Sequence, residues 1–77
     1  MYLLFAGKLY NEIGLLYAKC FQYAKAKTCF ELALPLVRSK DKGSEAVILQ
    51  NIGAIYNGVE EYQTALDFHE KAATLHG

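Results

Sequence analysis

The feature that most constrains this chain is an internal repeat with a period of 39 residues, from Gly14 to Gly53. When the sequence is shifted by that distance, identical residues coincide in a single register over the whole overlap, without a gap. The coinciding pairs are Ile13 and Ile52, Gly14 and Gly53, Tyr17 and Tyr56, Tyr23 and Tyr62, Ala26 and Ala65, Glu31 and Glu70, Ala33 and Ala72, and Leu36 and Leu75. Such a period indicates a repeat protein, in which each copy is one supersecondary unit that packs against the next.

Each copy contains two segments in which apolar residues recur at helical spacing. These segments are residues 9–17 and 23–34 in the first copy and residues 48–56 and 62–73 in the second. The chain has one proline and no run of alternating apolar and polar residues, so strands are not expected. We therefore predict an all-α fold of two helix–turn–helix units, residues 1–40 and 41–77, within one continuous α-solenoid domain that is part of a longer array.

The predicted turns depend on four residues, two in each turn. Asn57 and Gly58 are expected to end the third helix, because both tolerate the left-handed backbone conformation. Residues 38–44 are expected to join the two copies. Within that joint, Gly43 would allow the turn and Ser44 would cap the following helix.

Glycine inside a helix costs about 1 kcal/mol relative to alanine, so Gly14 and Gly53 require a reason. We predict that two helices approach at Gly53 too closely for a side chain, with Ala65 as the small surface opposite. His69 is expected to be a half-buried structural residue. The predicted core residues are Tyr10, Ile13, Tyr17, Phe30, Leu49, Ile52, Tyr56 and Tyr62.

Composition argues against several classes of function. Eight basic residues balance eight acidic ones, so nucleic-acid binding is not expected. The apolar opening segment, MYLLFAG, is too short to span a bilayer, and no direct membrane insertion is expected. Cys20 and Cys29 make no disulfide framework, which favours a reducing, cytoplasmic location. No catalytic motif, phosphate-binding loop or metal-ligand spacing is found, so we expect no enzyme activity, metal or cofactor.

The repeated residues resemble the tetratricopeptide repeat (TPR) family, whose pattern has a large residue, Leu-Gly, Tyr, and then Ala-x-x-x-Phe. The family period is about 34 residues, and the longer period here is similar to the TPRs of cell-polarity and G-protein-linked scaffolds or of SH3-and-TPR adaptor proteins. The matching segments are Tyr10-x-x-Ile13-Gly14-x-x-Tyr17, Leu49-x-x-Ile52-Gly53-x-x-Tyr56, Ala26-x-x-x-Phe30 and Ala65-x-x-x-His69.

The resemblance implies a protein-interaction module that binds a peptide or protein partner in a concave groove lined by the first helix of each unit. Asn51 would bond a bound peptide's backbone, because an amide both donates and accepts. Asn11 and Leu15 stand where chaperone-tail binders have Lys and Asn, so chaperone-tail binding is not expected. The implied groove residues are Lys8, Asn11, Glu12, Leu15, Lys19, Gln50, Asn51, Ala54 and Asn57.

A second function class remains open at this point. Two repeat units leave apolar faces at both ends of the stack, because solenoid units bury their faces against neighbours. The chain would then be a structural or assembly element that self-associates through these faces into a homo-oligomer, without a peptide ligand. Loss of partner binding on replacing Lys8 and Asn51 would favour the groove over the assembly role.

Overall fold

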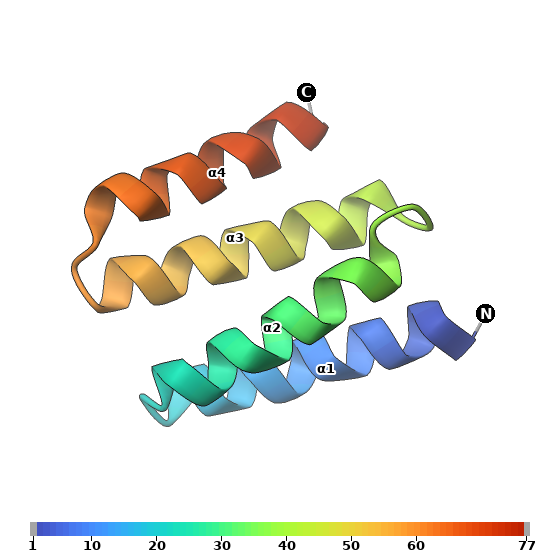
Figure 1. The fold of residues 1–77 in the computed structure, drawn as a ribbon, viewed down its shortest axis with the longest axis horizontal. Coiled ribbons are helices and arrows are strands. Elements are labelled where there is room, and N and C mark those ends of the chain that lie inside the picture. The colour runs from blue at the N-terminus through green and yellow to red at the C-terminus, as the bar shows by residue number, and fades with distance from the viewer. Residues whose placement is uncertain (1, 77) are drawn as a thin grey trace.

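A computed structural model describes residues 2–76, and these form four α-helices and no strand. The helices are α1 (Tyr2–Lys19), α2 (Tyr23–Val37), α3 (Lys42–Gly58) and α4 (Tyr62–His76). They run antiparallel in sequence order and are joined by short turns (Figure 1). The predicted all-α fold of two helix–turn–helix units is confirmed, with α1 and α2 as the first unit and α3 and α4 as the second. Residues 1 and 77, at the outer limits of the predicted units, lie outside the described part.

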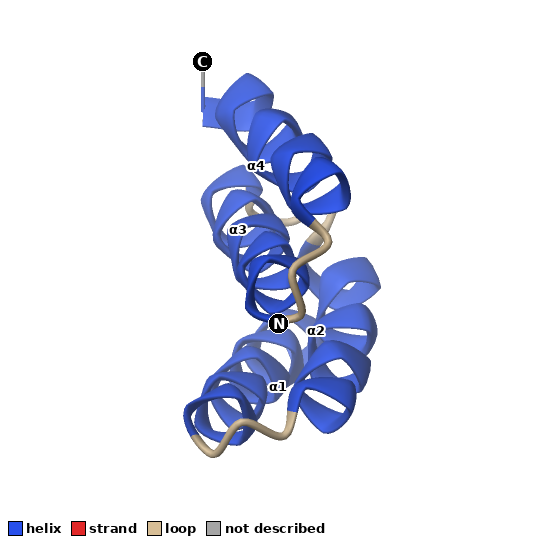
Figure 2. Ribbon diagram, turned by 90° about the vertical axis from the view of Figure 1, so that its left-hand side faces the viewer, coloured by secondary structure: helices blue, strands red, loops and turns tan. Residues whose placement is uncertain are grey.

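The two units stack into a thin slab that measures 36 × 29 × 14 Å. The first helices of both units, α1 and α3, lie along one side, and α2 and α4 lie along the other (Figure 2). Within residues 2–76, α3 packs against all three other helices, whereas α4 packs against α3 alone. The slab is therefore held together through α3.

Both units turn from their first helix into their second through the same backbone conformation. Phe21 has a φ of 61° and Glu60, which is 39 residues later, has a φ of 67°. In the first turn the Tyr17 carbonyl accepts the N–H of Gln22, the residue after Phe21, at 3.0 Å. In the second turn the Tyr56 carbonyl accepts the N–H of Glu61, the residue after Glu60, at 2.8 Å. This is a Schellman motif, which satisfies carbonyls at the helix end. The predicted end of the third helix at Asn57-Gly58 is confirmed, because α3 ends at Gly58. The expected reason is wrong, because Glu60, and neither Asn57 nor Gly58, takes the left-handed conformation.

The joint between the units is shorter than predicted, because α3 already begins at Lys42. Asp41 caps this helix in an extended conformation, and its Oδ1 accepts the N–H of Gly43 at 3.1 Å. The Ser44 hydroxyl donates to Asp41 Oδ2 at 2.8 Å. The prediction that Gly43 turns the chain and Ser44 caps the helix is therefore wrong. An aspartate upstream accepts helix N–H groups as well as serine does, and it moves the helix cap by three residues, from Ser44 to Asp41.

The main core lies where α2 meets α1 and α3. Its buried members are Ala26, Phe30, Ala33, Val37, Ile48, Ile52 and Ile55, and a second cluster of Ala46, Leu49 and Ala72 joins α3 to α4. Of the predicted core residues, Phe30, Leu49 and Ile52 are buried, and Tyr17 and Tyr56 are half-buried.

Three residues predicted to be core are exposed instead, namely Tyr10, Ile13 and Tyr62. Tyr10 and Ile13 occupy the same repeat positions as the buried residues Leu49 and Ile52. The difference arises because α2 covers this face of α3, whereas no helix among the described residues covers the same face of α1.

Each repeated glycine marks a close approach of the two helices in its unit. A Cβ at Gly14 would lie 2.6 Å from the Phe30 ring, and a Cβ at Gly53 would lie 2.9 Å from the His69 imidazole and 3.2 Å from the Ala65 carbonyl oxygen. The predicted close approach at Gly53 is confirmed. His69, however, is exposed rather than half-buried, because the side of α4 that corresponds to the buried Phe30 carries no further helix in residues 2–76.

Candidate functional site

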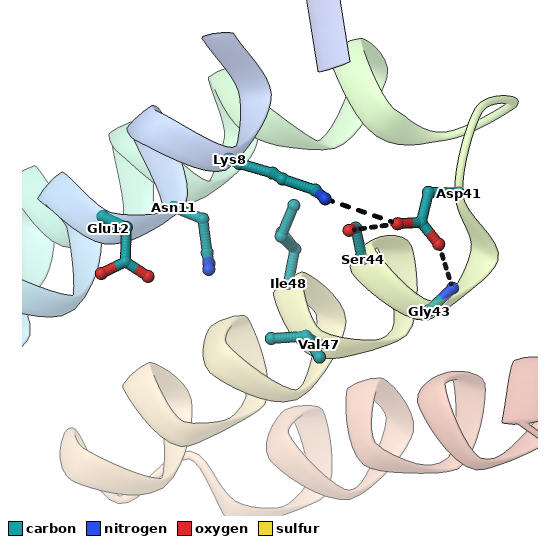
Figure 3. A pocket seen from close by; sticks show the side chains of 8 residues that line it. All are labelled: Lys8, Asn11, Glu12, Asp41, Gly43, Ser44, Val47 and Ile48. Carbon is teal, nitrogen blue, oxygen red and sulfur yellow. Dashed lines mark hydrogen bonds and ion pairs between the residues drawn. The ribbon is translucent and has the colours of Figure 1, made fainter. Parts of the chain in front are cut away.

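An open groove of about 460 Å³ lies between α1 and the first two turns of α3. Figure 3 shows its side chains, with those of α1 on one wall and those of the α3 N-terminus on the other. The lining residues are Lys8, Asn11, Glu12, Asp41, Gly43, Ser44, Val47 and Ile48. The groove belongs to the side of the slab formed by the first helices of the units.

One end of the groove is closed by a cluster of polar groups around Asp41. Lys8 Nζ reaches from α1 to within 3.9 Å of Asp41 Oδ2, the same oxygen that accepts from the Ser44 hydroxyl (Figure 3). Hydrogen bonds from the hydroxyl and the backbone N–H of Ser44 lower the pKa of the Asp41 carboxyl, and the Gly43 N–H and the Lys8 ammonium add to that shift. The cap of α3 is therefore ionised at neutral pH and engages the only ammonium of the groove lining.

Farther along the same face, two side-chain amides join the units. Asn51 Nδ2 on α3 donates to Asn11 Oδ1 on α1 at 2.7 Å. The bond leaves one carbonyl oxygen on Asn51 and one NH₂ group on Asn11 to face other partners. The amide pair thus offers an acceptor and a donor side by side, which is the pattern that a peptide backbone can match.

The floor of the groove is apolar and its charge is unbalanced. Val47 is exposed on the floor beside the buried side chain of Ile48. The lining contains two carboxylates, Glu12 and Asp41, against one ammonium, Lys8, which is already within ion-pair distance of Asp41. The excess carboxylate of Glu12 disfavours an acidic ligand and favours a basic or neutral one.

The structure brings together three of the nine residues implied by the resemblance, namely Lys8, Asn11 and Glu12. Asn51 does not line the groove itself but bonds to Asn11 beside it. Leu15 is half-buried and packs on the main core. The remaining four, which lie outside the groove lining and are exposed, are Lys19, Gln50, Ala54 and Asn57. Their part in binding stays a prediction.

Sequence reasoning missed the α3 side of the groove. Val47 occupies the same repeat position as Lys8, so the repeat register itself could have identified it. Asp41 was missed for a different reason. Its place in the groove follows from the early start of α3, which Asp41 itself signals as a preferred capping residue, but the sequence-based prediction places the cap at Ser44 instead.

We also searched the described residues for metal-binding groups, for cysteine pairs and for membrane-spanning helices. Within residues 2–76, no three His, Cys, Asp or Glu side chains are grouped so that they could hold a metal ion. Cys20 and Cys29 are both free thiols. No helix in the described part combines the length and the apolar character needed to cross a membrane.

Comparison with known proteins identifies the family. The sequence profile described as tetratricopeptide repeat matches residues 5–76, nearly the whole chain. No solved structure matches the chain at a significant level. The profile match, the two helix–turn–helix units and the repeated glycine contacts agree, and the chain therefore belongs to the tetratricopeptide repeat family.

Proposed function

We propose that this chain binds an extended segment of a partner protein in the groove between α1 and α3, as part of a larger cytoplasmic adaptor or scaffold of the long-period type. Tetratricopeptide repeats generally mediate protein–protein interactions. The observation that carries the finer proposal is the groove itself, which has an apolar floor at Val47, a carboxylate at Glu12 and, at its side, an amide pair that joins α1 to α3. These are the elements from which peptide-binding grooves are built.

The arrangement supports a specific kind of peptide. The backbone of an extended segment would pair with the Asn11 NH₂ group and the Asn51 carbonyl, an apolar side chain would cover Val47, and a Lys or Arg side chain would approach Glu12. A terminal carboxylate is a poor ligand, because the Lys8 ammonium is held near Asp41 at 3.9 Å. This agrees with the sequence-based expectation, drawn from Asn11 and Leu15, that the chain does not bind chaperone tails.

The test begins with selection of random peptides displayed on phage against the immobilised chain. The selected sequences should be rich in Lys and Arg next to an apolar residue and poor in Asp and Glu. One selected peptide is then synthesised with a fluorophore, and its affinity for the chain and its variants is measured by fluorescence anisotropy.

Variants of the groove should change the affinity in opposite directions according to charge. Glu12→Gln, Val47→Ser and Asn51→Ala should each weaken binding by about tenfold, since each removes one specific contact worth about 1.4 kcal/mol. Lys8→Ala should strengthen the binding of a basic peptide, because it removes a like charge. Leu32→Glu, an exposed change on α2 outside the groove lining, is the matched control and should leave the affinity unchanged.

Peptides that bind the Val47→Ser, Asn51→Ala and Lys8→Ala variants as they bind the original chain would place recognition elsewhere on the molecule. That result would overturn the proposal that the groove between α1 and α3 binds the peptide, and a selection that yields no binding peptide would favour the assembly role. Circular dichroism of each variant separates loss of binding from loss of folding.

A further inference from the structure

The contact between α2 and α3 shows how one unit is covered by the other. On α3, three isoleucines are buried in one cluster with Phe30 of α2, and their side chains are 1–4% exposed. They are Ile48, Ile52 and Ile55. On α2, the residues that meet α3 follow a helical stripe. They are Tyr23 against Gly58, Lys27 over the Tyr56 ring, Phe30 in the isoleucine cluster and Leu34 against the second cluster.

The 39-residue repeat places an equivalent of the isoleucine surface on α1. The three residues at the same repeat positions, here called the α1 stripe, are all apolar. They are Leu9, Ile13 and Leu16. Their exposed fractions are 47%, 43% and 62%, against at most 4% for their equivalents on α3. The α1 stripe is thus as apolar as a buried helix face, but it is exposed to solvent.

The same shift places an equivalent of the covering surface on α4. The residues that correspond to the α3-facing stripe of α2, here called the α4 stripe, are Tyr62, Leu66, His69 and Ala73. All four are exposed. Leu66 replaces Lys27, so the α4 stripe is also more apolar at that position than the stripe that already packs on α3.

We propose that the α4 stripe of one molecule covers the α1 stripe of a second copy of this chain, repeating between molecules the contact that α2 makes with α3 within one. The occupant is a second copy because the two stripes occupy the repeat positions of the two sides of the α2–α3 contact, so one copy offers each side to the next. Neither stripe carries a charged side chain, so no like-charge repulsion opposes the contact.

The repeat register specifies which residues meet. Tyr23 lies so close to Gly58 that a Cβ there would be 2.9 Å from its ring, and the equivalent position on the second copy is Lys19. The Tyr62 ring would therefore shift outward from the equivalent place and lie beside the Lys19 side chain. Leu66 would lie against Tyr17 of the second copy, as Lys27 lies over Tyr56 at 5.5 Å from its ring centroid. His69 would enter the α1 stripe as Phe30 enters the isoleucine cluster. Because the two stripes differ, the interface is heterologous and continues from copy to copy as a stack or ring.

The first measurement is sedimentation velocity of the chain over a wide range of concentration. The sedimentation coefficient should rise with concentration through a series of species beyond the dimer. Ile13→Glu disables the α1 stripe and Leu66→Glu disables the α4 stripe. Each should weaken self-association by at least about tenfold, because it places an unpaired carboxylate in an apolar contact. Leu32→Glu, which adds the same charge to an exposed α2 position outside both stripes, should associate as the original chain does.

Mixing the two disabled variants makes the test directional. The Ile13→Glu chain keeps its α4 stripe and the Leu66→Glu chain keeps its α1 stripe, so an equimolar mixture should form a heterodimer that cannot grow further. A symmetric α1-to-α1 contact would instead let Leu66→Glu chains associate alone and would give no heterodimer. If either variant is misfolded by circular dichroism, Leu16→Glu and Tyr62→Glu provide a second pair at more exposed positions of the same stripes.

Three results would overturn the proposal. They are a well-folded monomer at the highest concentration, single variants that associate as the original chain does, and a mixture without heterodimer. The groove variants Glu12→Gln and Val47→Ser should leave self-association unchanged, since neither residue belongs to a stripe. Failure of the stack is thus distinguishable from failure of the proposed peptide groove.

Discussion

The side-chain amides of Asn11 and Asn51 meet across the boundary between the two units, with 2.7 Å between Oδ1 of the first and Nδ2 of the second. This side-chain hydrogen bond joins two different helices. It spans α1 and α3, the two helices that border the groove. The bond therefore helps to fix the distance between the groove walls, and the two residues that form it are also placed to contact a peptide.

The first prediction concerns the strength of this amide pair. A double-mutant cycle with Asn11→Ala and Asn51→Ala should give a coupling free energy of about 0.5–1.5 kcal/mol, the usual net value of a hydrogen bond in a protein. Urea denaturation of the original chain, both single variants and the double variant measures it. Gln50→Ala, at an exposed neighbouring position on α3, should change the free energy of unfolding very little and is the control. Strictly additive single effects would show that the two amides do not interact.

The second prediction separates the two repeated glycines. Gly14→Ala should lower the free energy of unfolding by up to about 2 kcal/mol, because overpacking against the fully buried Phe30 ring exceeds the gain of about 1 kcal/mol in helix propensity. Gly53→Ala should change it by less than about 1 kcal/mol, because the exposed His69 imidazole can rotate away. Thermal melts of both variants test whether Gly14→Ala is the less stable of the two. A Gly53→Ala variant less stable than Gly14→Ala would contradict it.

The third prediction follows from the left-handed conformation of Glu60. Glu60→Gly should raise the free energy of unfolding by about 0.5–1 kcal/mol, because glycine adopts φ of 67° without the steric cost paid by a side chain. Glu61→Gly is the matched control, since the neighbouring residue does not have a positive φ, and it should destabilise. Phe21→Gly should show a smaller gain than Glu60→Gly, because it also removes the edge-to-face contact between Phe21 and Tyr23. Equal effects of Glu60→Gly and Glu61→Gly in urea denaturation would rule out relief of strain.

The fourth prediction is the pH dependence caused by Asp41. Its pKa is lowered in the folded chain, chiefly by hydrogen bonds from Ser44, so the folded state favours the ionised carboxylate. The resulting stability is fully present above the unfolded pKa of about 4 and is lost as pH falls through the lower folded value. Asp41→Asn, which keeps a capping side chain without the charge, should be less stable than the original chain at pH 7. The difference between the two should shrink below about pH 4. If the difference in the free energy of unfolding stayed constant from neutral to acid pH, the charge of Asp41 would not be the cause of the difference.

Much of the architecture was predictable because a repeat constrains a sequence at two places at once. Gly53 alone is an unfavourable helix residue, but its match with Gly14 identified a close helix approach, and the contacts with His69 and Phe30 confirm it. The number of helices and their pairing followed from the same register. The residues at the turns were harder to predict. Glu and Phe have no preference for the left-handed conformation, so Glu60 and Phe21 could not be recognised as turn residues. The hydrogen bonds of the turn impose that conformation on them.

Burial was predicted correctly only where a neighbouring helix exists to cause it. Ile13 and Ile52 are identical residues at equivalent repeat positions, yet one is exposed and the other buried. Residue type alone cannot separate them, because burial in a solenoid depends on what stands next to the helix. The groove shows the same limit. Lys8, Asn11 and Glu12 were assigned from a resemblance on one helix, whereas Asp41 and Val47 entered the site through the packing of the next one.

The dependence of the slab on α3 has a consequence for how the chain opens. Since α4 packs against α3 alone, its backbone amides should exchange with solvent through local fraying, whereas those of α3 should exchange only when the whole chain unfolds. A molecule that settles against α4 would give this helix a second support and slow the exchange of its amides. Deuterium uptake along residues 62–76 is therefore a label-free gauge of whether the outer face of α4 is occupied.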